Sequence, residues 1–440
     1  MTYYADRAWL GVEEGFAERV LISVADGRIT AVATGAEPGA AIRLPGLVIP
    51  GLVNAHSHAF HRALRGATAG GRGDFWTWRE QMYSVAANLT PDTYLALARA
   101  TYAEMVTTGI TTVVEFHYLH HDRDGRPYAD PNAMGHALTA AAAEAGIRLV
   151  LLDTCYLQAD VDGSPLTGPQ LRFTDGDADA WAERASHVDT PHPGAAIHSV
   201  RGVPPEAMRV VADWARREQR PLHLHLSEQV KENLACQAVH RRSPTELCAD
   251  TGVLGERTTA VHATHLSTTD IGLLGSTHTG VCFCPTTERD LADGIGPAAA
   301  LVGAGARLSL GSDSHAVIDL FEEARAVELN ERLATNERGS HQAAELLAAA
   351  TEGGAHSAGL AGPYGIRAGA PADLVAVRTD TIRTAGAAEA DPVAAVVFAA
   401  SGADVSHVVS AGRLIVEDGR HRLLDVPGEL AASIKAARGS

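Results

Sequence analysis

The sequence predicts an α/β protein in which a (β/α)8 TIM-like barrel carries a small β-sandwich domain built from both chain ends. Eight short apolar runs alternate with helix-length segments, which is typical of a closed parallel barrel. Strand-like segments with glycine turns lie before and after these runs. The length of 440 residues accommodates a barrel of about 250 residues and a smaller domain.

The two ends of the chain predict the smaller domain. Residues 8–50 alternate apolar and polar side chains around turn signals such as Ala25–Gly27. Residues 372–378 and 408–419 look similar and give two further strand groups with glycine turns. We therefore predict a β-sandwich domain from residues 1–50 and 364–440, and a barrel domain from residues 51–363.

The middle of the chain predicts the barrel. Its apolar runs are β-branched or aliphatic, and the segments between them are rich in Ala, Leu, Glu and Arg with helical spacing. The predicted strands are 47–54, 110–118, 147–155, 194–200, 221–227, 258–264, 279–285 and 307–313. The predicted helices are 92–108, 131–145, 204–218, 268–275, 297–305 and 318–335. The glycine-rich stretch 66–73 predicts a mobile loop after the first strand.

Composition limits the possible partners and the compartment. A formal net charge of −17 excludes the basic surface that nucleic acids and anionic membranes require, so an anionic small molecule must meet locally placed arginines. No apolar stretch approaches the length of about 18 residues needed for a membrane span, and the N-terminus has no secretory leader pattern. The five cysteines form no C-x-x-C pair. We expect free thiols in a cytoplasmic protein.

Histidines gather where predicted barrel strands end. His56 and His58 end the first run, and the two-residue period of a strand points both imidazoles into the barrel mouth. In the fifth run His223 and His225 share one face at different depths. We favour His225 as the ligand because it lies nearer the carboxyl end of the strand, with His223 as a hydrogen-bonded histidine deeper in the barrel.

A carboxylate ends the eighth run. Asp313 follows an apolar stretch, and with His56, His58 and His225 it completes a set of three imidazoles and one carboxylate. This ligand set suits Zn²⁺, although Fe²⁺ and Mn²⁺ accept the same ligand types. A site for two metal ions would need a lysine that bridges them, and the third and fourth strands have no lysine at their ends. We therefore predict one metal ion per chain.

Two more side chains have the positions of catalytic groups. His262 ends the sixth run, where its imidazole can orient a water molecule at the metal. Glu228 lies three residues after His225, where its carboxylate can pass a proton from the attacking water to a leaving nitrogen.

Taken together, His56-Ser-His58, His225 with Glu228, Val261-His262-Ala-Thr-His265 and Gly-Ser-Asp313 resemble the motifs of the amidohydrolase superfamily, in its deaminase branch. Further motifs resemble the formimidoylglutamate deiminase family within that branch. They are His56-Ser-His-Ala-Phe-His61-Arg, Phe75-Trp-Thr-Trp-Arg79-Glu, Glu115-Phe-His-Tyr118-Leu-His-His-Asp and His198-Ser-Val-Arg201. This resemblance spans the whole chain and implies hydrolysis of N-formimidoyl-L-glutamate to N-formyl-L-glutamate and ammonia, a step of histidine degradation.

The resemblance also implies roles for individual residues. It implies zinc ligands at His56, His58, His225 and Asp313, with Glu228, His262 and Asp313 acting on the attacking water. It implies a substrate-binding set of His61, Arg79, Tyr118, His198 and Arg201. The family usually has Gln where this chain has His61, which bears on the substrate because one changed contact can redirect specificity. Proteins with these motifs are usually homodimers.

Two alternatives remain open at this stage. The first is a deaminase of the same branch that acts on guanine, a nucleoside or a guanidino acid. Arg79 and Arg201, which the resemblance implies face carboxylates, argue against bare heterocycles. The second is a metal-free barrel used as an interaction scaffold, against which the presence of all four predicted ligands argues.

Overall fold

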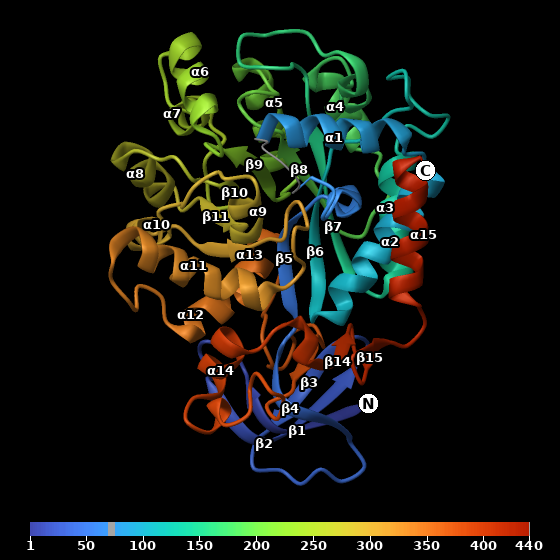
Figure 1. Ribbon diagram of the computed structural model, residues 1–440, viewed down its shortest axis with the longest axis vertical. Helices are drawn as coiled ribbons and strands as arrows, with labels where there is room; N and C mark the ends of the chain where they lie inside the picture. Colours follow the sequence, from blue (N-terminus) through green and yellow to red (C-terminus); the bar gives the residue numbers. More distant parts are fainter. Residues whose placement is uncertain (69–74, 440) are drawn as a thin grey trace.

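The computed structural model describes residues 1–68 and 75–439 and contains a parallel barrel sheet and a second, mixed sheet (Figure 1). Residues 69–73 of the predicted glycine-rich loop lie outside the described residues. The barrel sheet runs in the order β12-β11-β10-β9-β8-β7-β6-β5, and its neighbouring strands pair in parallel. The predicted (β/α)8 class is confirmed.

The eight barrel strands follow the predicted runs. They are β5 (Leu52–Ser57), β6 (Ile110–His117), β7 (Arg148–Cys155), β8 (Pro193–Ile197), β9 (Leu222–Leu226), β10 (Thr258–His262), β11 (Gly280–Phe283) and β12 (Leu308–Leu310). Nearly all of their residues are buried because the barrel interior faces one side and the helices cover the other.

The first predicted strand, 47–54, spans two different strands. β4 (Ile42–Pro50) belongs to the second sheet, and β5 starts the barrel. Gly51 separates them and donates its N–H to the carbonyl of Asp373 at 2.9 Å. A Cβ at Gly51 would lie 2.1 Å from the Oγ1 of Thr111, so only glycine fits this crossing. A continuous apolar run does not reveal such a change of sheet.

Side-chain caps mark the start of two of the long helices. Thr90 accepts a hydrogen bond from the N–H of Thr93 ahead of α2, and Asp319 does the same for Phe321 ahead of α11. All six predicted helices are present. The larger helices are α1 (Phe75–Asn88), α2 (Pro91–Thr107), α3 (Ala133–Ala145), α4 (Ala178–Ala185), α5 (Pro205–Arg217), α6 (Val230–His240), α8 (Thr268–Ser276), α11 (Leu320–Thr335), α14 (Pro392–Ala399) and α15 (Val426–Arg438). The shorter ones are α7 (Pro244–Asp250), α9 (Pro285–Asp290), α10 (Ala298–Ala304), α12 (Ala343–Ala348) and α13 (Gly354–Ser357).

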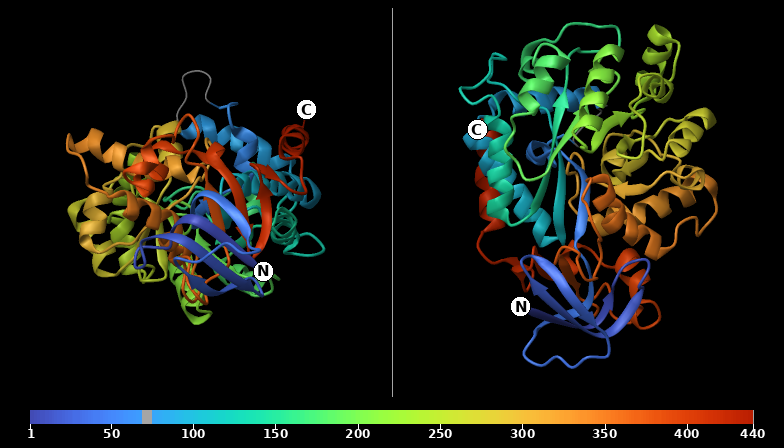
Figure 2. Two further views of the ribbon diagram at one scale, coloured as in Figure 1. Left: turned by 90° about the horizontal axis from the view of Figure 1, so that it is seen from below. Right: turned by 180° about the vertical axis from the view of Figure 1, so that it is seen from behind.

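Both chain ends build the second sheet, as predicted. Its order is β16-β15-β14-β13-β4-β1-β2-β3. Its other strands are β1 (Thr2–Trp9), β2 (Phe16–Ala25), β3 (Arg28–Ala33), β13 (Leu374–Val377), β14 (Val405–Ser410), β15 (Arg413–Glu417) and β16 (Arg420–His421). β4 joins the two ends because it pairs with β1 in parallel and with β13 in antiparallel orientation. This sheet lies below the amino ends of the barrel strands (Figures 1 and 2).

The last helix leaves the second sheet and returns to the barrel. α15 lies along α2 on the outside of the barrel (Figure 1). Arg99 of α2 donates from Nε to the carboxylate of Glu429 in α15 at 2.8 Å. Within the described part of the chain, no helix combines the length and the apolar character needed to span a bilayer.

A polar pair joins the first and last strands of the barrel. Asn54 of β5 donates from Nδ2 to the Oγ of Ser312 at 2.7 Å and accepts the N–H of Ser312 at 2.9 Å. Both side chains are fully buried. Further along, Ser57 and Asp313 form an isolated parallel bridge. These contacts close the barrel next to His56 and Asp313.

Replacing Asn54 with Ala should therefore weaken the closure. The buried N–H of Ser312 loses its acceptor, which costs about 1–3 kcal/mol of unfolding free energy. Urea denaturation of the purified protein measures this loss. The matched control is Asn88→Ala at the end of α1, a half-exposed position. Equal stability of the two variants would show that the pair does not hold the barrel closed.

Candidate metal centre

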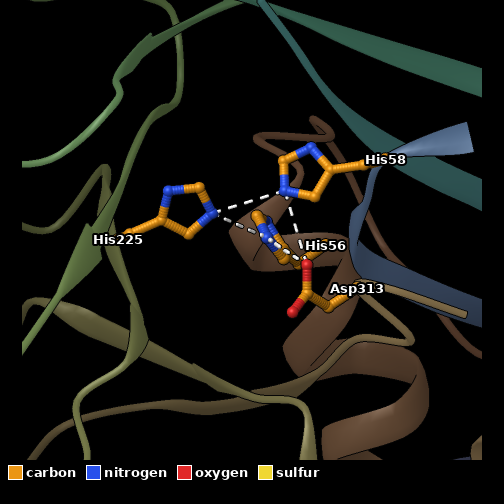
Figure 3. Close-up of side chains that lie close together, drawn as sticks. All are labelled: His56, His58, His225 and Asp313. Atoms are coloured by element: carbon orange, nitrogen blue, oxygen red, sulfur yellow. Dashed lines mark hydrogen bonds and ion pairs between the residues drawn. The ribbon is translucent and has the colours of Figure 1, made fainter. Parts of the chain in front are cut away.

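Four buried side chains converge at the carboxyl ends of three barrel strands (Figure 3). The Nε2 atom of His225 lies 3.2 Å from Nε2 of His56 and 3.4 Å from Nε2 of His58. The Oδ1 atom of Asp313 lies 3.3 Å from Nε2 of His56 and 3.4 Å from Nε2 of His58. The four ligand atoms lie within 4.8 Å of one another. The cluster joins the four residues that were predicted to share one metal ion.

Backbone carbonyls orient two of the imidazoles. His58 donates from Nδ1 to the carbonyl of Phe116 at 2.9 Å, and His225 donates from Nδ1 to the carbonyl of His198 at 2.8 Å. A neutral imidazole that donates from Nδ1 presents a lone pair at Nε2. The Nε2 atoms of both rings therefore point their lone pairs at the same place.

The electrostatics of the cluster suit a cation. Burial lowers the pKa of His58 to about 3, and burial also lowers the pKa values of His56 and His225. Although burial opposes the charge on Asp313, its contact with His56 holds the pKa of this carboxyl well below its usual range. The Nε2 lone pairs of His58 and His225 and the carboxylate of Asp313 repel one another at these distances, and a bound cation would relieve that repulsion.

A buried carboxylate supports the end of β5 and the residues that follow it, where His56 and His58 lie. Glu115 of β6 accepts hydrogen bonds from the Oγ of Ser57 at 2.7 Å and from the N–H of Ala59 at 2.6 Å. Burial raises the pKa of Glu115 to about 7. Sequence reasoning assigned no role to Glu115, although it belongs to one of the motifs, because its contacts are made across two strands.

The two histidines of β9 have different surroundings. His225 belongs to the metal cluster. His223 lies deeper and donates from Nε2 to the carbonyl of Ser357 at 2.8 Å. Burial lowers the pKa of His223 to about 4. This is the arrangement expected from their depths in the strand.

His262 and Glu228 lie beside the cluster. The Nε2 atom of His262 is 3.8 Å from Oδ2 of Asp313 and 3.8 Å from Oε1 of Glu228. Its Nδ1 atom lies 3.4 Å from Oε1 of Glu288. Although burial alone would lower the pKa of His262, the nearby carboxylates, first that of Glu228, raise it well above the usual value. Burial raises the pKa of Glu228. Such shifted groups at a barrel mouth are suited to proton transfer.

One cavity brings the predicted substrate-binding residues to this cluster. Its lining includes His61, Arg79, Tyr118, His198 and Arg201 together with His58, His225, Glu228, His262 and Asp313. Six further side chains line it that were not predicted, namely Trp78, Met82, Tyr83, Tyr156, Phe173 and Leu291. Trp78 belongs to the motif Phe75-Trp-Thr-Trp-Arg79-Glu. Because an aromatic residue in a helix is usually a core residue, its residue type alone does not predict this place in the cavity.

Contacts inside the cavity hold its polar groups in place. The Nε2 atom of His61 and the hydroxyl of Tyr118 form a hydrogen bond of 2.9 Å. Arg201 is buried and pairs with Glu232 at 2.7 Å and with Glu228 at 3.3 Å. The guanidinium of Arg79 lies over the ring of Tyr83, 5.6 Å from its centre. The cavity thus carries two cationic side chains and a carboxylate, and Arg201 lies directly beside Glu228.

The comparison with protein families agrees with this geometry. The model of the amidohydrolase family matches residues 47–415. The chain belongs to the amidohydrolase family. The match covers the barrel and, in the second sheet, β13, β14 and parts of β4 and β15. It includes every residue of the metal cluster and the cavity.

Individual relatives show which members of the family are similar to this chain. The chain is 37% identical over 436 residues to formimidoylglutamate deiminase from Pseudomonas aeruginosa, covering 95% of each chain. It is 30% identical to 5'-deoxyadenosine deaminase from Methanoregula boonei, covering 89% of this chain and 83% of that one. The crystal structure of an amidohydrolase from Brucella melitensis superposes with a TM-score of 0.91 at 32% identity, covering 99% of each chain. The present chain is thus a homologue of a deiminase that acts on C–N bonds.

A matched pair of variants tests the metal cluster. His225→Asn should lower metal affinity by more than the roughly 10–100-fold lost when an outer partner of a ligand is removed. His223→Asn, two residues away on the same strand, should retain the metal because its ring binds Ser357 instead. Elemental analysis after dialysis against a chelator measures the difference. Equal metal loss in both variants would contradict the assignment of His225.

Proposed function

We propose that this protein is a zinc-dependent deiminase that hydrolyses N-formimidoyl-L-glutamate to N-formyl-L-glutamate and ammonia. The observation that carries this proposal is a single cavity in which a buried carboxylate, two arginines and a cluster of potential metal ligands face one another. The 37% identical relative with this activity supports it. The step would belong to histidine degradation, as it does in the family that the motifs resemble.

The substrate explains why each kind of group is present. N-formimidoyl-L-glutamate has a cationic amidine at one end and two carboxylates at the other. We propose that Glu228 pairs with the amidine, while Arg79 and Arg201 bind the carboxylates with charge-assisted hydrogen bonds. His61, Tyr118 and His198 complete the binding set. A bare purine ring has no carboxylate for either arginine to bind, which argues against guanine and nucleosides.

The four ligand types suit a zinc ion. Three imidazoles and one carboxylate are the ligand types of catalytic zinc sites, although Fe²⁺ can bind them as well. We propose one Zn²⁺ per chain, held by His56, His58, His225 and Asp313. When bound, such an ion would lower the pKa of the attacking water towards neutrality.

Different residues of the chain carry out the separate proton transfers. Asp313 accepts the proton of the attacking water, and His262 holds the water's oxygen towards the amidine carbon. Glu228 first pairs, as a carboxylate, with the cationic amidine. The proton then passes from Asp313 to Glu228, which delivers it to the terminal nitrogen. The bond between the amidine carbon and this nitrogen breaks, ammonia leaves, and Asp313 accepts the remaining hydroxyl proton. Arg201 holds Glu228 at 3.3 Å and keeps this carboxylate directed into the cavity.

The compartment, oligomeric state and partners of the enzyme follow from its composition and its resemblance to the family. We propose a cytoplasmic homodimer that binds a small anionic substrate and neither nucleic acid nor membranes. The net charge of −17 supports the exclusion of polyanionic partners. Within the described chain, all five cysteines are buried and none forms a disulfide, which suits a reducing compartment.

A direct assay tests the substrate. Purified zinc-loaded protein should release ammonia from N-formimidoyl-L-glutamate much faster than from guanine, 5'-deoxyadenosine or a guanidino diacid. The ammonia is measured with a coupled dehydrogenase, and the metal content of the same sample is measured in parallel. Faster turnover of a purine or of the guanidino acid would replace the proposed substrate with that compound.

The variant Glu228→Gln tests the mechanism. Turnover should fall by about 10² or more, the usual contribution of a positioned acid or base, while the metal content stays unchanged. The matched control is Glu232→Gln, which removes a charge from the same Arg201 but lies outside the cavity lining, and should cost less. Unchanged turnover in Glu228→Gln would remove this residue from the mechanism.

A further inference from the structure

A second group of potential ligands adjoins the first. His262 ends β10, Cys284 follows β11 directly, and Asp313 follows β12. A nitrogen of His262, the sulfur of Cys284 and a carboxylate oxygen of Asp313 lie within 4.8 Å of one another. All three side chains are buried. The proposed mechanism uses His262 and Asp313 but gives no part to Cys284.

The carboxylate of Asp313 faces both groups. Its Oδ1 atom lies 3.3 Å from His56 and 3.4 Å from His58, and its Oδ2 atom lies 3.8 Å from Nε2 of His262. A carboxylate can bind two cations, one through each oxygen. The orientation of Asp313 therefore allows a second cation without removing this ligand from the first.

Glu288 holds the other two members of the group. It accepts the backbone N–H of Cys284 at 2.9 Å, and the same oxygen lies 3.4 Å from Nδ1 of His262. With Nδ1 engaged there, the Nε2 atom of His262 remains directed towards Asp313. The Sγ atom of Cys284 also lies near the primary cluster, because a Cβ built on Gly311 would be 2.9 Å from this sulfur and 2.7 Å from the Cβ of His56.

The three ligand types select a class of cation. Thiolate sulfur favours soft and borderline ions such as Cd²⁺ and Zn²⁺, whereas Mg²⁺ and Ca²⁺ prefer oxygen ligands alone. Three protein ligands with a position left for water are a common composition for zinc sites that remain open. Binding of such an ion displaces the thiol proton of Cys284 and the Nε2 proton of His262, and both protons leave to solvent.

We propose that His262, Cys284 and Asp313 form a second, inhibitory site for thiophilic divalent cations. Its effect on turnover rests on the proposed function, in which His262 and Asp313 act on the attacking water. A cation bound by both side chains withdraws them from that water. Excess Zn²⁺ or Cd²⁺ then inhibits an enzyme that already holds its first metal ion.

A cadmium titration tests the site without relying on turnover. Protein loaded with one equivalent of zinc should bind a further equivalent of Cd²⁺, with the ultraviolet charge-transfer band of a cadmium–thiolate bond. The primary cluster contains no sulfur, so exchange at that cluster does not produce the band. Cys284→Ser should lose the band and the further equivalent while keeping the first metal ion. The matched control Cys248→Ser, at a buried cysteine of α7, should behave as the unchanged protein.

Inhibition gives the second readout. Cys284→Ser should keep its ammonia release at one equivalent of zinc but need at least about tenfold more Zn²⁺ for half-inhibition, the change expected when one of three ligands is lost. Cys284→Ala repeats the test if the serine variant melts at a lower temperature than the unchanged protein.

Three outcomes would overturn the proposal. They are a band that persists in both Cys284 variants, no further equivalent bound by the unchanged protein, or binding at Cys284 without any inhibition. A band lost in Cys282→Ser but kept in Cys284→Ser would assign the sulfur to the neighbouring cysteine instead. Because the cadmium band needs no substrate, it still decides the site if N-formimidoyl-L-glutamate is not hydrolysed.

Discussion

Lone pairs that point at one another dominate the chemistry of this barrel. The Nε2 atoms of His58 and His225 lie 3.4 Å apart, and the carboxylate of Asp313 faces the same place. A fold can keep such groups together only if each is fixed from outside. Backbone carbonyls fix His58 and His225, and the paired Asn54 and Ser312 close the barrel between the strands that carry the other two ligands. The affinity for a cation thus depends on contacts that never touch it.

The cavity joins this cluster to side chains of opposite charge. Arg201 contacts both Glu232 and Glu228. In the proposed function, the arginine that would bind an anion therefore also positions the carboxylate that would bind a cation. The overall charge of −17 makes this local arrangement necessary, since the molecule as a whole repels anions.

Much of the architecture could be predicted from the sequence because it depends on local patterns. The apolar runs predicted the barrel strands, and the residues at their ends predicted the members of the metal cluster. The change of sheet at Gly51 could not be predicted, because β4 and β5 form one apolar run and only the approach of Thr111 requires the break. Glu115 and the aromatic lining of the cavity were missed for a similar reason, since their partners lie on other strands and other helices.

The pairing of β4 with β13 has a consequence for how the chain is made. Pro50 pairs with Leu374, so the two strands at the centre of the second sheet meet only after the whole barrel sequence has been synthesised. Until then β4, which is apolar at Leu47–Ile49, is an open edge able to pair with other chains. Contacts this distant in sequence also form slowly. Nascent and truncated forms of this enzyme are therefore the species most exposed to aggregation.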